Sequence, residues 1–235
     1  MKITLTNDNL NLIANTEGAY IENFSCDGKD VFFQKFETEI KGKKKTRGGC
    51  HPCLPSFGPS EINDLKDHGY GRDYEWEIAE KSSSKLVLKL EGKCGYEGMD
   101  SFISYELLED GLFAEIEMLN KSEKDLPVAP GFHPYFKVGN DFEIEGLDLG
   151  DFNLEDTYFL DASEVSFKGE AYKIKITSQN FHKFAIWTDF LDNYRCVEPC
   201  YNGKSFVKGG NPKILKAGET FISRMIVEIT DKDHL

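Results

Sequence analysis

The sequence predicts an all-β protein, folded as a large antiparallel β-sandwich. Short runs of alternating apolar and polar residues recur along the chain, and glycine-containing turns separate several of them. No segment has the 3.6-residue periodicity of an amphipathic helix over more than two turns. Many short strands joined by tight turns are typical of two packed sheets. A sandwich of 235 residues is commonly one folding unit, so residues 1–235 are predicted to form a single domain.

The strands are predicted from the alternation, and the turns from their glycines. Residues 1–10 alternate apolar and polar side chains, which predicts a first strand and not a signal peptide. Asp27-Gly28 and Asp110-Gly111 each lie between two such runs. Both predict hairpin turns, because glycine supplies the positive φ that tight hairpins require. The clearest further strands are residues 85–90, 113–118, 172–176, 184–187 and 221–229.

Other segments are predicted to be irregular. Residues 46–59 contain Gly48-Gly49 and then three prolines, which argues against a central strand and favours a surface loop. Loops of this kind often carry binding groups, and Arg47 beside two glycines would let a guanidinium and the backbone approach a ligand together. Residues 41–45, with four lysines, are expected to be a solvated loop. Short helices are expected at residues 60–67 and 207–209.

Charge and composition exclude some classes of partner. The formal net charge is −13, so nucleic acid and anionic membranes are not expected as partners, because both require a positive face. No stretch approaches the ~20 apolar residues that span a bilayer. With no export signal in the sequence, the protein is expected to be cytoplasmic, as a monomer or a homodimer. The six cysteines are then expected to be free thiols.

Three compact polar and aromatic clusters, at residues 67–72, 131–136 and 196–199, interrupt the β-pattern. Together they contain His68, His133 and Glu198, the residue types that a proton-transfer site at neutral pH requires. His133 precedes a proline, so its backbone is predicted to be extended and its ring to point off the end of a strand. Pro199 is predicted to end the strand that carries Glu198, at the rim of a cleft. A histidine such as His133 is, taken alone, more often a packed and hydrogen-bonded residue than an acid.

Two further features bear on ligands. Cys50-x-x-Cys53 together with Cys196 and Cys200 offers four thiolates in two close pairs, which is the ligand count of a structural zinc site. The prolines near both pairs make tetrahedral geometry difficult, so unpaired thiols and no bound metal are the prediction. His182 and His234 are expected at the surface without a role.

The clusters, taken in their order, resemble the aldose 1-epimerase (galactose mutarotase) family. The resemblance covers the chain almost from end to end, although the chain is short for the family. It implies a galactose mutarotase-like supersandwich with an open groove. It also implies an isomerase that interconverts the α and β anomers of an aldose through the open-chain sugar, with no cofactor. The matching segments are Arg47-Gly48-Gly49, Leu54-Pro55, Phe57-Gly58, His68-Gly69-Tyr70-Gly71-Arg72, Trp76, His133-Pro134-Tyr135-Phe136, Val197-Glu198-Pro199 and Leu215-Lys216-Ala217-Gly218-Glu219.

The same resemblance implies roles for single residues. Glu198 would be the general base that takes the proton of the anomeric hydroxyl, and His133 the general acid that protonates the ring oxygen. His68 would assist at that oxygen or orient the sugar. The substrate-binding residues would be Arg47 and Arg72, which bind hydroxyls or a phosphate, Asp189 as a sugar-binding carboxylate, and Tyr135, which packs against the apolar face of the sugar.

Three functions stay open at this point. A mutarotase acting on a free hexose is the first, and a hexose-6-phosphate 1-epimerase is the second, since Arg47 and Arg72 could hold a phosphate. The third is a sugar-binding protein on the same fold without useful turnover. A glycosidase is disfavoured, because it needs two facing carboxylates and only Glu198 has a clear placement.

Overall fold

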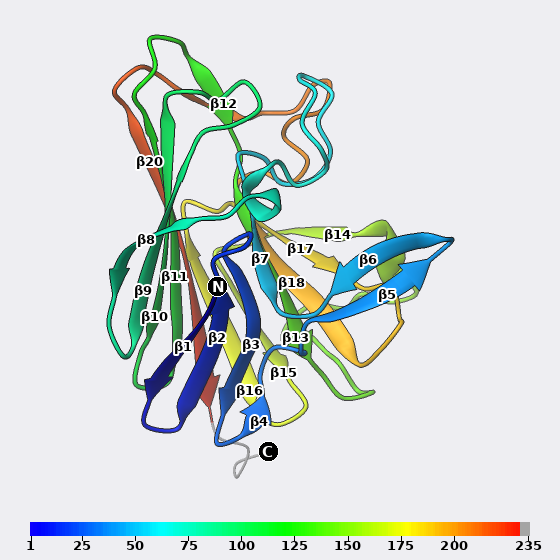
Figure 1. Cartoon of the computed structure of the whole chain (residues 1–235). Coiled ribbons are helices and arrows are strands. Elements are labelled where there is room, and N and C mark those ends of the chain that lie inside the picture. Colours follow the sequence, from blue (N-terminus) through cyan, green and yellow to red (C-terminus); the bar gives the residue numbers. More distant parts are fainter. Residues whose placement is uncertain (231–235) are drawn as a thin grey trace.

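The computed structural model describes residues 1–230, and it consists mainly of two large antiparallel sheets that pack against each other (Figure 1). The predicted all-β sandwich is therefore confirmed. One sheet has nine strands, in the order β1-β2-β3-β7-β13-β18-β17-β14, with β4 paired to β3. Its strands are β1 (Lys2–Asn7), β2 (Leu10–Asn15), β3 (Tyr20–Cys26), β4 (Lys29–Asp30), β7 (Cys50–Cys53), β13 (Gly131–Lys137), β14 (Tyr158–Asp161), β17 (Lys183–Trp187) and β18 (Tyr194–Cys200).

The other large sheet has seven strands, in the order β15-β16-β20-β11-β10-β9-β8. They are β8 (Glu77–Lys81), β9 (Lys85–Glu91), β10 (Met99–Leu107), β11 (Gly111–Asn120), β15 (Glu164–Lys168), β16 (Lys173–Gln179) and β20 (Thr220–Thr230). Two small sheets complete the described strands: β5 (Phe36–Ile40) with β6 (Lys43–Arg47), and β12 (Leu126–Val128) with β19 (Lys213–Leu215).

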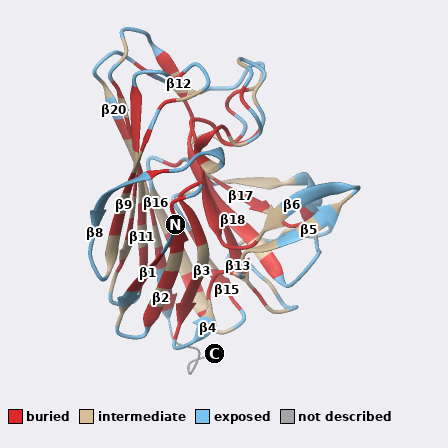
Figure 2. Ribbon diagram, in the orientation of Figure 1, coloured by how far each residue is buried: buried red, intermediate tan, exposed pale blue. Residues whose placement is uncertain are grey.

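The core lies between the two large sheets. On β20 every second residue from Phe221 to Ile229 is buried, as period-2 alternation requires of a strand with one face inward. The main cluster of buried side chains draws on strands from both ends of the chain, from Ile3 to Ile229, and Figure 2 shows buried residues along the strands of both large sheets. The single-domain organisation of residues 1–235 stays a prediction.

Both predicted hairpins are present, but their glycines serve different needs. Asp27 and Gly28 have positive φ values of 46° and 72° and connect β3 to β4, as a tight turn demands. Gly111 instead opens β11 as a paired strand residue. A Cβ atom there would lie 1.9 Å from the carbonyl oxygen of Val227 on β20, so this glycine permits the close approach of two strands.

The prediction of an irregular surface loop for residues 46–59 is wrong in its central part. Cys50–Cys53 form β7, an inner strand of the nine-stranded sheet, and all four residues are buried. Proline is tolerated here because β7 and β3 share a single residue pair, Ile21 with Cys50. The backbone pairing on that side does not extend to Pro52, so its missing N–H breaks no strand pairing there.

The two predicted short helices are also wrong. At residues 60–67 the Asn63 side chain accepts hydrogen bonds from the Ser60 hydroxyl and the Leu65 N–H, which stabilises bends in place of helical turns. Residues 207–209 form a turn that ends in a glycine with positive φ. Within residues 1–230 the helices are the three-residue η1 (Gly71–Asp73) and η2 (Leu154–Asp156), far shorter than a membrane-spanning segment.

The lysine-rich segment at residues 41–45 is exposed, as predicted, but it belongs to a hairpin and not to a loop. Lys41 and Gly42 form the turn between β5 and β6, with φ values of 52° and 76°. The β5–β6 hairpin extends away from the two large sheets (Figure 1). Its base carries Arg47, which places that side chain beside the centre of the nine-stranded sheet.

Candidate active site

The candidate site lies on one face of the nine-stranded sheet, over its central strands. Side chains two residues apart on a strand share a face, so Glu198 points to the same side of β18 as Cys196 and Cys200. Residue pairing joins His133 to His51, and the pairs Gly131–Cys200 and Tyr135–Cys196 place Glu198 opposite His133. His51, His133 and Glu198 therefore form one row across β7, β13 and β18.

The two prolines beside these residues do not end their strands, and both positional predictions are wrong. His133 lies within β13, followed by Pro134, and Glu198 lies within β18, followed by Pro199. The strands continue because Pro134 and Pro199 fall in the stretch where the ladder between β13 and β18 is interrupted. Both side chains are consequently buried in the sheet, with Glu198 only 2% exposed, and neither lies at a cleft rim.

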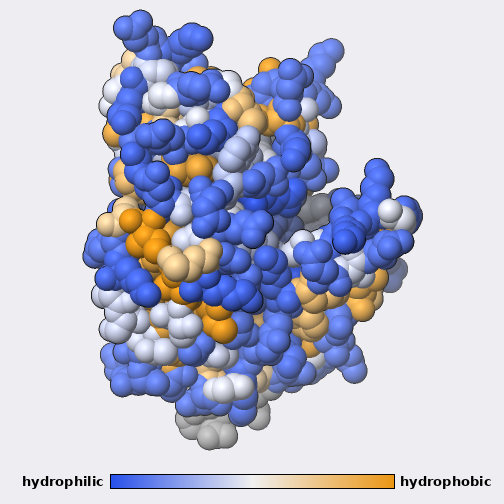
Figure 3. Space-filling model, in the orientation of Figure 1, coloured by the Kyte–Doolittle hydropathy of each residue, from blue (hydrophilic) through white to orange (hydrophobic). Residues whose placement is uncertain are grey.

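A cavity of about 760 Å³ lies over this row. Figure 3 shows the surface hollowed between the β5–β6 hairpin and the loops on the opposite side. Residues far apart in the sequence meet in its wall: His68 from the loop after β7, Arg72 from η1 and Arg47 from β6. Six of the seven predicted site residues line it, namely Arg47, His68, Arg72, His133, Tyr135 and Glu198, with His51 and Trp187 among the others.

His133 and Glu198 form a buried pair. Their Nε2 and Oε2 atoms are 3.3 Å apart, but the contact lacks hydrogen-bond geometry, and Glu198 Oε2 and His133 Nδ1 have no hydrogen-bond partner. Tyr135 stacks on the His133 ring, with the centroids 4.8 Å apart and the planes 15° from parallel. Since buried polar atoms are normally hydrogen-bonded, the two unpartnered atoms single out this pair as a candidate functional site.

Burial opposes charge on both members of the pair. It raises the pKa of Glu198 well above its ordinary value, and Asp67 adds to this effect. It lowers the pKa of His133 well below its ordinary value, and the nearby His68, Arg72 and Arg47 act in the same direction. Both shifts favour a neutral pair, in which the one exchangeable proton lies on Glu198. A pair with one proton contains one donor and one acceptor, which is what acid–base catalysis requires.

Glu198 should make the protein's stability depend on pH. Its pKa is higher in the folded protein than in the unfolded chain, so between those two values only the folded state holds the proton. Stability therefore falls as the pH rises through that range. Glutamine has the same size and does not titrate. The melting temperature of Glu198→Gln should therefore equal that of the native protein near pH 4 and exceed it by about 3 °C or more at pH 8. Thermal melting at both pH values measures this, and equal melting temperatures at pH 8 would contradict it.

His68 is held as a neutral donor. Its backbone has a positive φ of 65°, its side chain lines the cavity, and the Gly58 N–H donates to its Nδ1 at 3.2 Å. Burial lowers the pKa of His68 to about 4. With Nδ1 accepting, the proton of the neutral ring lies on Nε2. The ring centroid is 5.3 Å from that of His133, so His68 can donate a hydrogen bond to a ligand beside that residue.

His51 is a site residue that the sequence analysis did not assign. Its ring centroid is 4.8 Å from that of His133, and its Nε2 lies 3.4 Å from Arg72 Nη1. Because arginine can only donate, Nε2 accepts and the proton lies on Nδ1, which donates to the Pro52 carbonyl at 3.3 Å. His51 therefore positions the guanidinium of Arg72. Alternation in residues 50–53 could have indicated it, but the proline argued against a strand.

The two arginines of the cavity differ in how their charge is compensated. Arg47 Nε donates to Asp189 Oδ2 at 2.6 Å, and its guanidinium lies over the Trp187 ring. Asp189 also accepts from the Tyr194 hydroxyl. Asp189 thus positions Arg47 and is not among the residues that line the cavity, and its predicted contact with the sugar stays a prediction. Arg72 Nη2 donates to the Asp67 carbonyl, and no carboxylate of residues 1–230 forms an ion pair with it.

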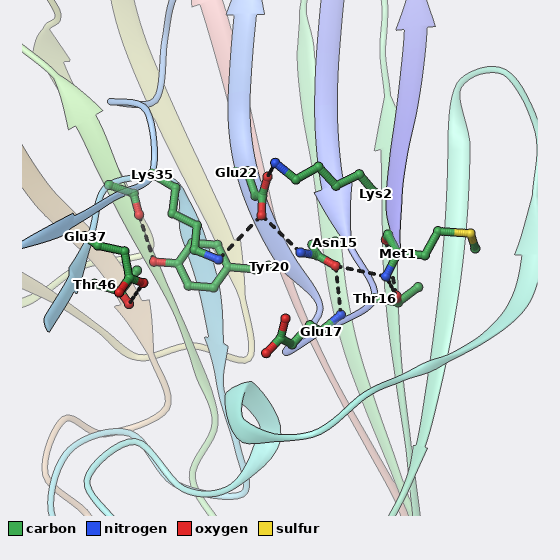
Figure 4. Close-up of polar contacts among 11 residues, drawn as sticks. Met1, Lys2, Asn15, Thr16, Glu17, Tyr20, Glu22, Lys35, Glu37 and Thr46 are labelled. Atoms are coloured by element: carbon green, nitrogen blue, oxygen red, sulfur yellow. Dashed lines mark hydrogen bonds and ion pairs between the residues drawn. The ribbon is translucent and has the colours of Figure 1, made fainter. Parts of the chain in front are cut away.

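One wall of the cavity is braced by polar contacts on β2 and β3 (Figure 4). The Tyr20 hydroxyl donates to the Gly48 carbonyl at 2.8 Å, next to Arg47. Lys35 lies over the Tyr20 ring at 4.5 Å and forms an ion pair with Glu22. These contacts fix the start of β7 against β3, so the base of the β5–β6 hairpin has a defined position.

The four cysteines near the site do not form the zinc site considered from the sequence. Cys50 faces the core, Cys53 and Cys200 pack with Phe57, and Cys196 packs with Tyr135. Cys50, Cys53, Cys94, Cys196 and Cys200 are free thiols. Among residues 1–230, the group with the spacing of metal ligands is instead His133, Cys196 and Glu198. Of the histidines predicted at the surface, His182 is exposed and His234 lies outside the described residues.

Comparison with known proteins decides the family. A family model described as aldose 1-epimerase matches residues 1–172. The chain belongs to the aldose 1-epimerase family. The predicted resemblance is confirmed, and the predicted enzyme class, an isomerase, is the class of this family.

Individual relatives are distant. A protein of Escherichia coli K12 named "Putative glucose-6-phosphate 1-epimerase" is 25% identical over 142 residues, which cover 57% of this chain and 48% of that protein. The chain spans about half the length of the curated relatives it matches. Among solved structures, a Synechocystis protein has a TM-score of 0.83 at 18% identity, covering 99% of this chain and 96% of that one. A galactose mutarotase related enzyme from Lactobacillus acidophilus has a TM-score of 0.80 at 17% identity, covering 98% of each chain. These likenesses show the galactose mutarotase-like fold.

Proposed function

We propose that this member of the aldose 1-epimerase family interconverts the α and β anomers of a hexose. The observation that carries the proposal is the buried pair of His133 and Glu198 at the floor of the cavity, with an unpartnered atom on each side chain. Anomerisation needs one proton removed from the sugar and one delivered to it, and a pair that holds one proton supplies both functions. The cavity has the size of a small-molecule site.

The reaction begins with ring opening. Glu198, as the carboxylate, takes the proton of the C1 hydroxyl, the C1–O1 bond becomes a carbonyl, and the C1–O5 bond breaks. His133, as the imidazolium, donates its proton to O5. In the bound complex the proton of the pair lies on His133, where the carboxylate 3.3 Å away and the sugar hydroxyls stabilise the charge.

Ring closure reverses these transfers. Rotation about the C1–C2 bond presents the other face of the carbonyl to O5. His133 now takes back the O5 proton as O5 attacks C1, and Glu198 returns a proton to O1. The neutral His68 donates a hydrogen bond from Nε2 near the reacting oxygens, and Tyr135 and Trp187 offer aromatic surface to the sugar ring. The protein ends each cycle in its starting protonation state.

Optical rotation tests this function. Freshly dissolved α-D-glucose and α-D-galactose should approach equilibrium faster with the native protein than in buffer alone. A protein that binds these sugars and hexose 6-phosphates without accelerating the change would be the sugar-binding protein considered as the third function, and the epimerase proposal would fail.

A hexose 6-phosphate is the second candidate substrate, and the charge of the cavity favours it. The lining contains six basic side chains and five acidic ones, so it lacks the strong excess of acidic groups that gives the whole chain its net charge of −13. Arg72 in particular has no ion-pair partner among residues 1–230, which leaves its guanidinium available to a phosphate. The curated Escherichia coli relative carries the name of an enzyme for such a substrate.

Replacement of Arg72 should separate the two substrates. If Arg72 binds the phosphate, Arg72→Gln should lower kcat/KM for glucose 6-phosphate at least tenfold more than for glucose, because a charge-assisted hydrogen bond contributes about 1.5–3 kcal/mol. Anomer exchange measured by NMR gives both values. Lys208→Gln, at an exposed position outside the cavity, is the control. Equal losses for both sugars would make Arg72 a binder of hydroxyls and reject the phosphate site.

A further inference from the structure

We propose that His133, Cys196 and Glu198 form an open binding site for a thiophilic divalent cation such as Zn²⁺, and that the cation excludes the sugar. The three side chains place a ring nitrogen, a sulfur and a carboxylate oxygen all within 4.8 Å of one another, and all three are buried. The inhibitory effect rests on the proposed epimerase function, whereas the binding of the cation does not.

The sheet geometry brings these groups together. Cys196 and Glu198 are two residues apart on β18, so they share a face, and His133 on the adjacent β13 lies opposite Glu198. Two ligands from one strand and one from its neighbour form three corners of a coordination sphere. Zinc–nitrogen and zinc–sulfur bonds place ligand atoms roughly 3.5 Å apart in a tetrahedron. Side-chain movements of about 1 Å would bring the three ligand atoms to that separation.

Two polar atoms of the proposed ligands also lack hydrogen-bond partners. Glu198 Oε2 and His133 Nδ1 have no hydrogen-bond partner although both are buried. A cation would satisfy atoms that the protein itself leaves unpaired. The ring of His133 is held in place by stacking on Tyr135, which limits the rearrangement needed for coordination.

The donor set favours zinc over harder cations. A thiolate with an imidazole and a carboxylate suits zinc, whereas magnesium and calcium prefer sites made of oxygen ligands. Cys196 would bind as the thiolate and release its proton to solvent. Three protein ligands leave a fourth position for an exchangeable ligand, and two of the three, His133 and Glu198, line the cavity. A cation bound there would occupy the acid and the base of the proposed reaction, so it would inhibit in competition with the sugar.

Cobalt spectroscopy on the full chain tests the site without reference to activity. Co²⁺ bound to a thiolate gives a charge-transfer absorption in the near ultraviolet. The native protein should show this band on titration with Co²⁺ and should lose it on addition of Zn²⁺. Cys196→Ala and the nearly isosteric Cys196→Ser should show no such band, and Zn²⁺ should inhibit their sugar turnover at least tenfold less strongly than that of the native protein.

Cys200→Ala is the matched control. Cys200 also lies two residues from Glu198 on the same face of β18, but its sulfur contacts the Lys183 carbonyl and it is not among the three ligands. This variant should keep both the band and the zinc sensitivity. A native protein without the band, or a band that survives in both Cys196 variants, would overturn the site. A Cys196-dependent band in a protein without epimerase activity would support the site and reject the proposed function.

Discussion

Replacing Glu198 with glutamine is expected to lower the rate of anomer interconversion by at least about a hundredfold, the size of effect found for general acid–base groups. The amide cannot accept the C1 hydroxyl proton as a carboxylate does, although it fills the same volume in the sheet. The variant should still bind the sugar, since Arg47, Arg72 and Tyr135 are unchanged around the cavity. The expected signature is thus a large loss in kcat with little change in the sugar dissociation constant.

The control for Glu198→Gln is the same substitution at a glutamate outside the site. Glu123 is exposed and lies outside the cavity, so Glu123→Gln makes the same chemical change without touching the proposed site. It should retain the native rate. The higher melting temperature expected for Glu198→Gln at pH 8 distinguishes a loss of catalysis from a loss of folding. A Glu198→Gln protein that binds sugar and turns it over at a near-native rate would remove Glu198 from the mechanism.

Removing the imidazole of His133 should have an effect of similar size. In His133→Ala the ring oxygen loses its proton donor, and we expect the rate to fall by at least about a hundredfold at neutral pH. His182→Ala removes an exposed histidine that is not among the residues lining the cavity, and it should keep full activity. Steady-state rates of the two variants at pH 7 are the measurement.

A second variant distinguishes loss of the proton donor in His133→Ala from collapse of the cavity. The ring stacks on Tyr135 and contacts the His51 ring, so its removal leaves space in the floor of the site. His133→Gln keeps a polar side chain of comparable size without an acid of the required pKa, and it should be as slow as His133→Ala. Recovery of activity in His133→Gln would mean that His133 acts through packing and not through proton transfer.

Much of the fold could be predicted from local sequence, because alternation depends only on neighbouring residues. Residues 85–90 and 221–229 showed it clearly, and both are strands. The failures came from prolines, whose effect depends on the partner strand. Pro52 and Pro199 argued for a loop and for a strand end, but each lies where its sheet leaves the pairing incomplete. No local pattern carries that information.

The candidate site was predictable in its membership and not in its geometry. His68, His133 and Glu198 were found from sequence because they lie in clusters that resemble a known family. Their convergence depends on the register of β7, β13 and β18, which long-range packing determines. His51 was missed for the same reason that β7 was. The ion pair of Asp189 with Arg47 joins residues that are distant in the sequence, so no local pattern predicted it.

The central claim is that the buried pair transfers protons during anomer exchange, and exchange measured by NMR at equilibrium tests it most directly. Saturation of the α anomeric proton of glucose or of glucose 6-phosphate should transfer to the β signal with native protein. The same transfer should be absent above background with Glu198→Gln at equal sugar occupancy. Equal transfer with native protein and Glu198→Gln, or no transfer with native protein for either sugar, would contradict the account.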